Sequence, residues 1–217
     1  MVEYNFLNFT SVVEAFKYHH NRDPFSHVVI DNFFTAETAQ QLSKDFFAFD
    51  SDKWKFTKGN SKNCNNWNNF PKLTYTVFSY LCGEDFTRFL QGILGTTRLY
   101  PDPGLQNAGL YITGSSKKTK PKIDDIVHTK LNLQKTLNLI VYLSTDLKEE
   151  YGGHLGLWSC NEENQTPNKL VTEIAPVFNR AVLFYTDKNS FYNTSRSIKV
   201  PEKVYKKTIT LQYLQEI

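Results

Sequence analysis

Cysteine is scarce in this sequence, and long hydrophobic runs are absent. The three cysteines, Cys64, Cys82 and Cys160, are odd in number and widely spaced, so neither a zinc-binding spacing nor a disulfide framework is visible. Residues 1–16 contain acidic side chains and no long apolar run, which argues against a signal peptide and against a membrane span. We therefore expect a reduced, cytoplasmic protein.

A strong excess of charge of one sign is also missing. The formal net charge is +3, which is too small to indicate a nucleic-acid partner by itself. Four lysines gather at Lys117, Lys118, Lys120 and Lys122, and such runs usually form solvated loops. Aromatic residues are abundant instead, at 15% of the chain, and hydrophobic residues make up 40%. A chain of 217 residues with this composition predicts one domain with a sizeable core.

The first half of the chain has the patterns of helices and loops. The apolar run at 26–34 predicts a strand, and Thr35 can then cap a helix that runs to about Phe47. Residues 60–69 are polar and rich in turn formers, so we expect a loop there, and a second helix is predicted from Glu84 to Leu94. The first helix places its apolar residues on one face: Ala36, Ala39, Leu42 and Phe46.

From about Leu105 onward, short β-rich runs alternate with turns. The predicted strands are 137–144, 154–159, 170–174, 180–186 and 207–214, with a turn at Gly152 and Gly153. Many short strands without intervening helices favour a sandwich or jelly roll. Helices first and strands later fit an α+β chain whose helices pack on one outer face.

Four segments resemble the prolyl-4-hydroxylase-like branch of the iron(II)/2-oxoglutarate oxygenase superfamily. They are DNFFTAETAQQLSKDF at 31–46, LNLIVYLSTDLKEEYGGHLGLWS at 137–159, IAPVFNRAVLFYTDKNSFYN at 174–193 and KKTITLQYL at 206–214. The resemblance implies a mainly β core, a double-stranded β-helix (jelly roll, cupin-like), with N-terminal helices packed on one face. It also implies a single domain over 1–217, with a helical lead-in and support at about 1–103 and the β-helix core at about 104–217.

This family binds iron(II) through a His-x-Asp pair and a distal histidine, which leaves open positions for 2-oxoglutarate and dioxygen. A basic residue holds the far carboxylate of 2-oxoglutarate. In this sequence Lys122 and Asp124 fall at the His-x-Asp pair, and Tyr192 falls at the distal histidine. Lys206 and Thr208 fall at the positions that hold 2-oxoglutarate. Asp124 is therefore the one family metal ligand that is retained.

The remaining histidines do not supply the missing ligands in the sequence pattern. His19, His20 and His27 lie in the N-terminal part, which we expect to be helical and outside the barrel. His128 and His154 do not start a His-x-Asp motif, and we expect both at the surface or at strand ends.

The substitutions suggest that a polar cluster has replaced the metal. Residues i and i+2 of a strand share a face, so Lys122 and Asp124 are expected to point together into the barrel. The Lys122 ammonium then supplies the positive charge that iron would have supplied, and the Tyr192 phenol can donate a hydrogen bond to Asp124.

Three functions follow from the resemblance. The first is an oxygenase fold without normal iron binding, which uses its pocket, with Lys206 as anchor, to bind a small acid such as 2-oxoglutarate, or its lysine loop to bind a protein or peptide partner. The second is an active iron(II)/2-oxoglutarate hydroxylase with a rearranged site that joins Asp124 to His128 or His154. The third is a metal-independent enzyme in which Lys122 acts as nucleophile or base and Tyr192 as acid.

Overall fold

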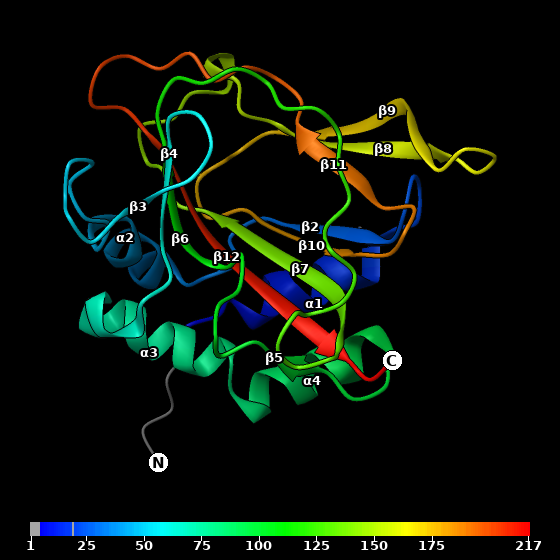
Figure 1. Ribbon diagram of the computed structural model, residues 1–217. Coiled ribbons are helices and arrows are strands. Elements are labelled where there is room, and N and C mark those ends of the chain that lie inside the picture. The colour runs from blue at the N-terminus through cyan, green and yellow to red at the C-terminus, as the bar shows by residue number, and fades with distance from the viewer. Residues whose placement is uncertain (1–4, 19) are drawn as a thin grey trace.

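Two antiparallel sheets face each other in the computed structural model, which describes residues 5–18 and 20–217 (Figure 1). Within these residues the major sheet has the strand order β1-β2-β10-β7-β12-β6-β4-β3, and β5 pairs with β12. The minor sheet has the order β11-β8-β9. Its strands are β8 (Leu155–Asn161), β9 (Thr166–Ile174) and β11 (Phe191–Thr194). The major sheet contains β1 (His20–Asn21), β2 (His27–Ile30), β3 (Lys55–Phe56), β4 (Ser61–Cys64), β5 (Tyr100–Pro101), β6 (Gly109–Thr113), β7 (Gln134–Tyr142), β10 (Ala181–Tyr185) and β12 (Lys206–Gln215).

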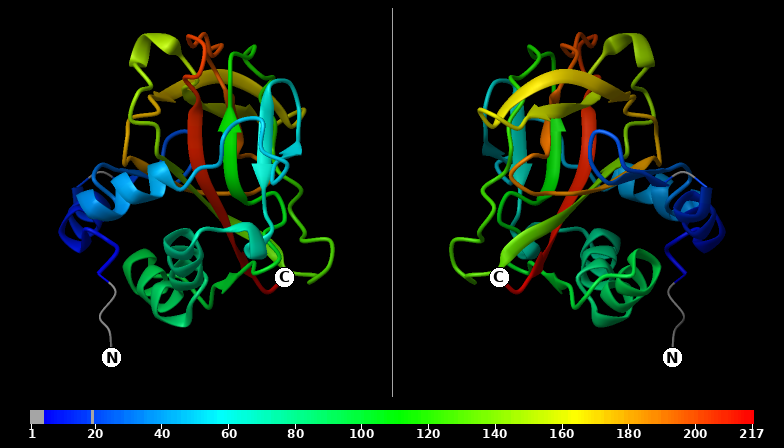
Figure 2. Two further views of the ribbon diagram at one scale, coloured as in Figure 1. Left: turned by 90° about the vertical axis from the view of Figure 1, so that its left-hand side faces the viewer. Right: turned by 90° about the vertical axis from the view of Figure 1, so that its right-hand side faces the viewer.

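The helices lie against the outer face of the major sheet, on the side away from the minor sheet (Figure 2). They are α1 (Phe9–Tyr18), α2 (Ala36–Lys44), α3 (Lys72–Leu81) and α4 (Glu84–Leu94), with short 3-10 turns at Trp67–Asn69 and Glu149–Tyr151. The predicted cap of α2 is present, because the Thr35 hydroxyl accepts a hydrogen bond from the Thr38 N–H. The predicted bounds of α4 are confirmed. The predicted α2 ends three residues too late, and Ala36 is exposed.

Alternation along β7 divides the interior into two parts. Leu137, Leu139 and Val141 pack into the large core between the major sheet and the helices, as alternate residues of a strand must. Ile140 and Tyr142 point the other way, into a smaller cluster between the two sheets. The space between the sheets therefore has room for polar side chains, and this is where the candidate site lies.

The first 103 residues are less helical than the sequence suggested. They supply β1 to β5 to the major sheet, and the loop predicted at 60–69 contains β4 and a 3-10 turn. The Asn63 side chain donates to the carbonyls of Ala108 and Leu110 at 3.0 and 3.2 Å. Pairing with β6 thus supplies hydrogen-bond partners to a segment whose local composition favours turns. Strand formation depends on tertiary context, and here it overrides the local preference.

The predicted fold class is confirmed: the chain is α+β and mainly β, with the jelly-roll arrangement of a double-stranded β-helix and helices on one face. Among the helices in the described ranges, none has both the length and the hydrophobicity that crossing a membrane requires.

Candidate functional site

Asp124 is the centre of a hydrogen-bonded cluster between the sheets. The Tyr192 hydroxyl donates to Asp124 Oδ1 at 2.6 Å, and Lys122 Nζ donates to the same oxygen at 3.2 Å. Asn138 Nδ2 donates to Oδ2 at 2.9 Å, and Gln212 Nε2 lies 3.5 Å from that oxygen. Four protein donors therefore surround one carboxylate, and both of its oxygens already have partners.

Strand pairing explains why these donors converge. Lys122 and Tyr192 form an antiparallel bridge, with backbone N–H···O distances of 3.0 and 2.9 Å. Asn138 on β7 and Gln212 on β12 are register partners in the major sheet, and directly opposite residues share a face. One pair reaches Asp124 from the minor-sheet side and the other from the major sheet. The cluster thus links the two sheets across the barrel.

Lys122 lies at the edge of this cluster rather than inside the barrel. Its side chain is 66% exposed, whereas that of Asp124 is 9% exposed. Its ammonium also lies 5.5 Å from the centre of the Tyr192 ring, within the range of a cation–π contact. The Lys122 ammonium therefore lies beside Asp124, as expected, but at the exposed edge of the cluster and not in the interior of the barrel, because a long lysine side chain keeps its ammonium in water while its stem follows the strand.

The cluster changes the acidity of both of its buried members. Burial alone would raise the pKa of Asp124, but the hydrogen bond from Tyr192, the Lys122 charge and the bond from Asn138 together lower it. Burial, the Asp124 charge and the hydrogen bond to Asp124 raise the pKa of Tyr192 well above its ordinary value. At neutral pH the pair is therefore a carboxylate that accepts from a neutral phenol.

Three members of this environment were not predicted from the sequence. Asn138 and Gln212 each interrupt an apolar strand with a polar residue, and both are buried. Tyr111 on β6 is close enough for the Asp124 charge to act on it, and burial followed by this charge raises its pKa to about 12. A buried amide in an otherwise apolar strand needs a hydrogen-bond partner. That rule would have identified Asn138 and Gln212 as members of an internal polar cluster.

Removal of the Tyr192 hydroxyl is expected to destabilise the fold more than removal of the Lys122 ammonium. Tyr192→Phe deletes a buried hydrogen bond to a charged group, which typically costs about 1.5–3 kcal/mol. Lys122→Met deletes a largely exposed ion pair, which typically costs less than about 1 kcal/mol. Urea unfolding of both variants beside the wild type measures the difference. A larger loss for Lys122→Met would show that the ammonium, and not the phenol, holds the carboxylate.

Lys206 and Thr208 lie on one face of β12, because they are two residues apart on one strand. Thr208 is buried and pairs with Tyr111 on β6 and Tyr142 on β7. The Lys206 ammonium donates to the Gly153 carbonyl at 3.4 Å, and it forms no ion pair with a carboxylate in the part of the chain that the structure describes. Burial lowers the pKa of Lys206 to about 8. An enclosed ammonium without an anionic partner is a natural anchor for an anionic ligand.

The Gly152–Gly153 turn shapes this end of the barrel. Both glycines have positive φ, at 81° and 78°, a region that other residues seldom adopt. A Cβ on Gly152 would meet the Ser197 carbonyl oxygen at 2.1 Å, and one on Gly153 would lie 3.4 Å from Lys206 Cδ. The turn therefore lets the backbone approach Lys206 closely and presents the Gly153 carbonyl to its ammonium.

His128 and His154 are buried rather than exposed, so the surface alternative is wrong for both, whereas His154 does lie at a strand end, directly before β8. His128 Nδ1 accepts from the N–H groups of Lys130 and Leu131, and its Nε2 lies 3.4 Å from Asp102 Oδ2. His154 lies just before β8, with Nε2 3.8 Å from Glu149 Oε1. Neither histidine is a hydrogen-bond partner of Asp124.

The described N-terminal histidines, His20 and His27, make no hydrogen bond with Asp124 either. His20 and His27 lie on β1 and β2 of the major sheet rather than on a helix, and His19 lies outside the described residues. His27 is buried, and its Nδ1 lies 2.8 Å from the Phe25 carbonyl oxygen. His20 and His27 are therefore part of the β1–β2 end of the major sheet.

The residues that the resemblance assigns to the family's metal position do not fit an iron(II) triad. Asp124 supplies one carboxylate, but the resemblance assigns the two histidine positions to an ammonium and a phenol, and a protonated amine has no lone pair to donate. No group of three or more His, Cys, Asp or Glu side chains that could hold a metal ion occurs among the described residues. The two oxygens of Asp124 are also already used by protein donors. The cluster fits a metal-free carboxylate better than a metal ligand.

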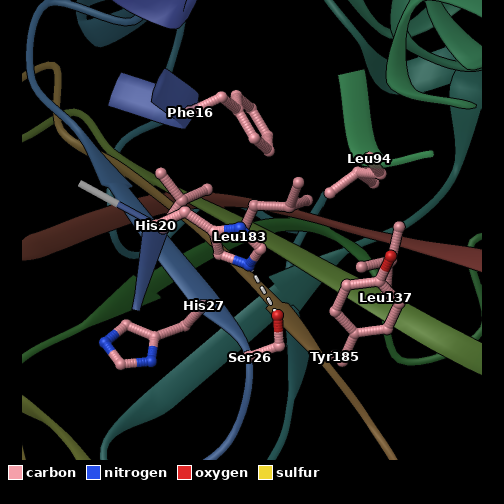
Figure 3. Close-up of a pocket in the computed structure, with 9 residues that line it drawn as sticks. Phe16, His20, Ser26, His27, Leu94, Leu137, Leu183 and Tyr185 are labelled. Carbon is pink, nitrogen blue, oxygen red and sulfur yellow. Dashed lines mark hydrogen bonds between the residues drawn. The ribbon is translucent and has the colours of Figure 1, made fainter. Parts of the chain in front are cut away.

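A separate hollow on the outer face of the major sheet does not belong to this site (Figure 3). Its wall is mostly apolar and includes Phe16, Leu94, Leu137 and Leu183. His20 Nε2 lies 2.6 Å from Ser26 Oγ at its rim. The side chains leave no space for a water molecule inside it, so the hollow is a packing feature of the helix–sheet core.

Comparisons with known proteins agree with the fold and the core sequence. Residues 114–208 match the family model of the 2OG-Fe(II) oxygenase superfamily. No curated protein matches the chain.

Several solved structures share the fold at low sequence identity. A prolyl hydroxylase from Trichoplax adhaerens, solved with a hypoxia inducible factor peptide fragment, has a TM-score of 0.57 at 15% identity, covering 95% of this chain and 88% of that one. A Pseudomonas putida prolyl-4-hydroxylase has a TM-score of 0.60 at 11% identity, covering 95% and 97%. A prolyl 4-hydroxylase from Phytophthora capsici has a TM-score of 0.61 at 16% identity, covering 94% of this chain and 62% of that one. The resemblance to the iron(II)/2-oxoglutarate oxygenase superfamily is therefore confirmed for residues 114–208, which match the family model. The solved structures, at 11–16% identity, show the same fold over 94–95% of the chain.

Proposed function

We propose that this protein uses the oxygenase fold to bind a small carboxylic acid without iron. Lys206 anchors the carboxylate, with Thr208 beside it on β12, and the Asp124 cluster takes the place of the metal. 2-Oxoglutarate is the acid that the resemblance points to, and other dicarboxylates offer the same chemistry. In an iron-loaded relative, 2-oxoglutarate supplies the electrons for dioxygen activation, whereas here its binding alone is proposed.

The observation that carries this proposal is that both carboxylate oxygens of Asp124 already accept hydrogen bonds from the protein. Tyr192 and Lys122 donate to one oxygen, and Asn138 donates to the other at 2.9 Å. To bind a metal in a bidentate or monodentate manner, Asp124 would have to give up one of these bonds, and Lys122 would add charge repulsion. Lys206 keeps a half-buried ammonium that forms no ion pair with a described carboxylate, which supports its role as an anchor for an acid.

The hydroxylase alternative lacks a set of ligands near Asp124. His128 is held by the Lys130 and Leu131 N–H groups and by Asp102, and His154 faces Glu149. Joining either histidine to Asp124 would require breaking these contacts. Iron-dependent turnover of 2-oxoglutarate is the measurement that would restore this alternative.

The metal-independent alternative meets an acidity problem. A general acid works best when its pKa lies near the working pH, and burial together with Asp124 raises the pKa of Tyr192 well above its ordinary value. Lys122 is largely exposed, and its ammonium is paired with the Asp124 carboxylate, so it is not an enclosed free amine of the kind that acts as a nucleophile. Borohydride trapping with carbonyl compounds at Lys122 would favour this alternative instead.

Thermal unfolding with a chelator present tests acid binding directly. A ligand that binds only the folded state raises the unfolding temperature, so 2-oxoglutarate or succinate should raise the midpoint in metal-free buffer. The dimethyl ester of succinate, which has the same chain without the charges, serves as the matched control and should cause no shift. If no dicarboxylate raises the unfolding midpoint, Lys206 is not an anchor for carboxylates.

Acid binding is expected to weaken in alkaline solution. Only the ammonium form of Lys206 attracts a carboxylate, and its pKa in the free protein is about 8. Below this pH the amine is protonated and affinity should be constant, whereas above it the dissociation constant should rise toward about tenfold per pH unit. Isothermal titration of succinate from pH 6.5 to 9.5 measures this profile. A flat profile through pH 9.5 would mean that Lys206 is not the anchor.

A further inference from the structure

Lys135, near the start of β7, has a buried ammonium without a partner. The residue is 1% exposed, and its Nζ atom makes no hydrogen bond with a described residue. It also forms no ion pair with a described carboxylate. Enclosing a charge without a partner is costly. The proposed binding of an acid at Lys206 gives Lys135 no role.

A β-bulge turns Lys135 away from the helices. Leu137 pairs with Tyr213 and Lys135 pairs with Leu214, so Thr136 is an extra residue on β7. Without this extra residue, Lys135 would share the face of Leu137, which packs into the core between the major sheet and the helices. With it, Lys135 lies opposite Leu214 and points to the same side of the sheet as that residue.

Gln212 brings a second atom without a partner to this face. It precedes Leu214 by two residues on β12, so the two side chains share a face. Gln212 Nε2 lies 3.5 Å from Asp124 Oδ2, whereas its Oε1 is buried and makes no hydrogen bond with a described residue. Lys135 and Gln212 are diagonal neighbours on the paired strands β7 and β12, a separation of about 7–8 Å that long side chains can span.

The two unpartnered atoms require opposite groups from a ligand. The Lys135 ammonium needs an anion such as a carboxylate, and the Gln212 amide oxygen needs an N–H or O–H donor. The buried charge of Asp124 lies on the Gln212 side, where it favours a positively charged donor. The Lys122 ammonium offsets this charge only in part, since it is 66% exposed and screened by water. An α-amino acid carries a carboxylate and an ammonium on one carbon atom and meets both requirements.

We infer that the interior face at Lys135 and Gln212 binds a free α-amino acid, whose carboxylate pairs with the Lys135 ammonium and whose ammonium donates to Gln212 Oε1. This site is separate from the Lys206 anchor. Lys206 and Gln212 are six residues apart on β12, about 20 Å along the strand, which is longer than a small acid. The inference goes beyond acid binding at Lys206 and does not depend on it.

Thermal unfolding in the presence of each standard amino acid in turn tests the inference. At least one of them should raise the unfolding midpoint of the full chain with a chelator present. Isothermal titration then compares that amino acid with two matched analogues. Its primary amide lacks the carboxylate and should bind at least about tenfold more weakly. Its α-hydroxy acid has a hydroxyl in place of the ammonium and should also bind more weakly, because a charged donor makes the stronger hydrogen bond.

Substitutions separate this site from the Lys206 anchor. Lys135→Met keeps the length of the side chain without its charge, so it should abolish the response to the amino acid and leave the response to succinate. Lys206→Met should do the reverse for an amino acid with an uncharged side chain. Gln212→Met removes only the acceptor and should weaken amino-acid binding without changing the response to succinate, which keeps the test decisive if Lys135→Met does not fold. Circular dichroism shows whether each variant is folded.

Each of four results would overturn the inference. The first is that no amino acid raises the unfolding midpoint. The second is equal binding of the primary amide, which would mean that no carboxylate meets Lys135. The third is equal or tighter binding of the α-hydroxy acid, which would assign the site to a different class of acid. The fourth is a response to the amino acid that is lost in Lys206→Met and kept in Lys135→Met or Gln212→Met, which would place the amino acid at Lys206.

Discussion

Replacement of Lys206 by methionine is expected to abolish stabilisation by dicarboxylates and, at the same time, to make the ligand-free protein more stable. The anchor is lost, so 2-oxoglutarate and succinate should no longer raise the unfolding midpoint. Burial lowers the pKa of Lys206 from 10.5 to about 8, which means that the folded state disfavours the charged amine. Methionine fills a similar volume without a charge that lacks a counterion.

The size and sign of the stability gain follow from linkage. A lysine whose pKa is depressed in the folded state costs stability in full below the folded pKa, and the cost disappears as the pH rises toward 10.5. At pH 7 the gain is at most about 3.5 kcal/mol, since the pKa falls from 10.5 to about 8 and each pKa unit corresponds to about 1.4 kcal/mol. Urea unfolding at pH 7 and at pH 10 should therefore show a large gain at the lower pH and a small one at the higher pH.

A matched control for this variant is Lys199→Met, which removes an exposed lysine from the same part of the chain. It should leave both the unfolding free energy and the response to dicarboxylates unchanged. If Lys206→Met is destabilising and still responds to succinate, Lys206 serves the fold and the acid binds elsewhere.

Restoring the two missing histidines is expected to create an iron site. Lys122→His/Tyr192→His removes the ammonium and the phenol that occupy Asp124 Oδ1, and it rebuilds a two-histidine, one-carboxylate donor set on the family fold. The variant should bind iron(II) at least about 100-fold more tightly than the wild type, because second-shell effects alone change metal affinity by 10- to 100-fold. Anaerobic equilibrium dialysis against iron(II), with metal analysis of both chambers, measures the affinity.

Lys122→His/Tyr192→Phe is the control for this experiment, since it removes the same two groups and supplies only one histidine. It should bind iron(II) far more weakly than the two-histidine variant. Equal iron binding by both variants would mean that the site is not built from these three positions.

The sequence indicated the fold well because its strongest signals are local. The apolar alternation at 137–144 and the Thr35 cap each depend on residues near in the chain, and β7 and α2 form where they indicate. The segment at 60–69 failed because its polar side chains find partners on β6, which lies far along the chain. Partners that lie far along the chain cannot be predicted from local composition.

The candidate site was only partly visible for the same reason. The family resemblance singled out Lys122, Asp124 and Tyr192, and the structure brings their side chains together. The exposure of Lys122 and the donors Asn138 and Gln212 depend on register across the major sheet. The burial of His128 depends on Asp102 and on the turn that follows it. The order of residues along one strand can mark Asn138 and Gln212 as amides in apolar strands, but it does not say which side chains they contact.

Anaerobic titration of the purified protein with iron(II) in the presence of 2-oxoglutarate tests the central claim most directly. The claim is that protein donors, and not a metal, neutralise Asp124. We predict no iron in the isolated protein and no metal-to-ligand charge-transfer band during the titration, while 2-oxoglutarate still raises the unfolding midpoint. Tight binding of one iron(II) per chain, with the charge-transfer band, would contradict the claim.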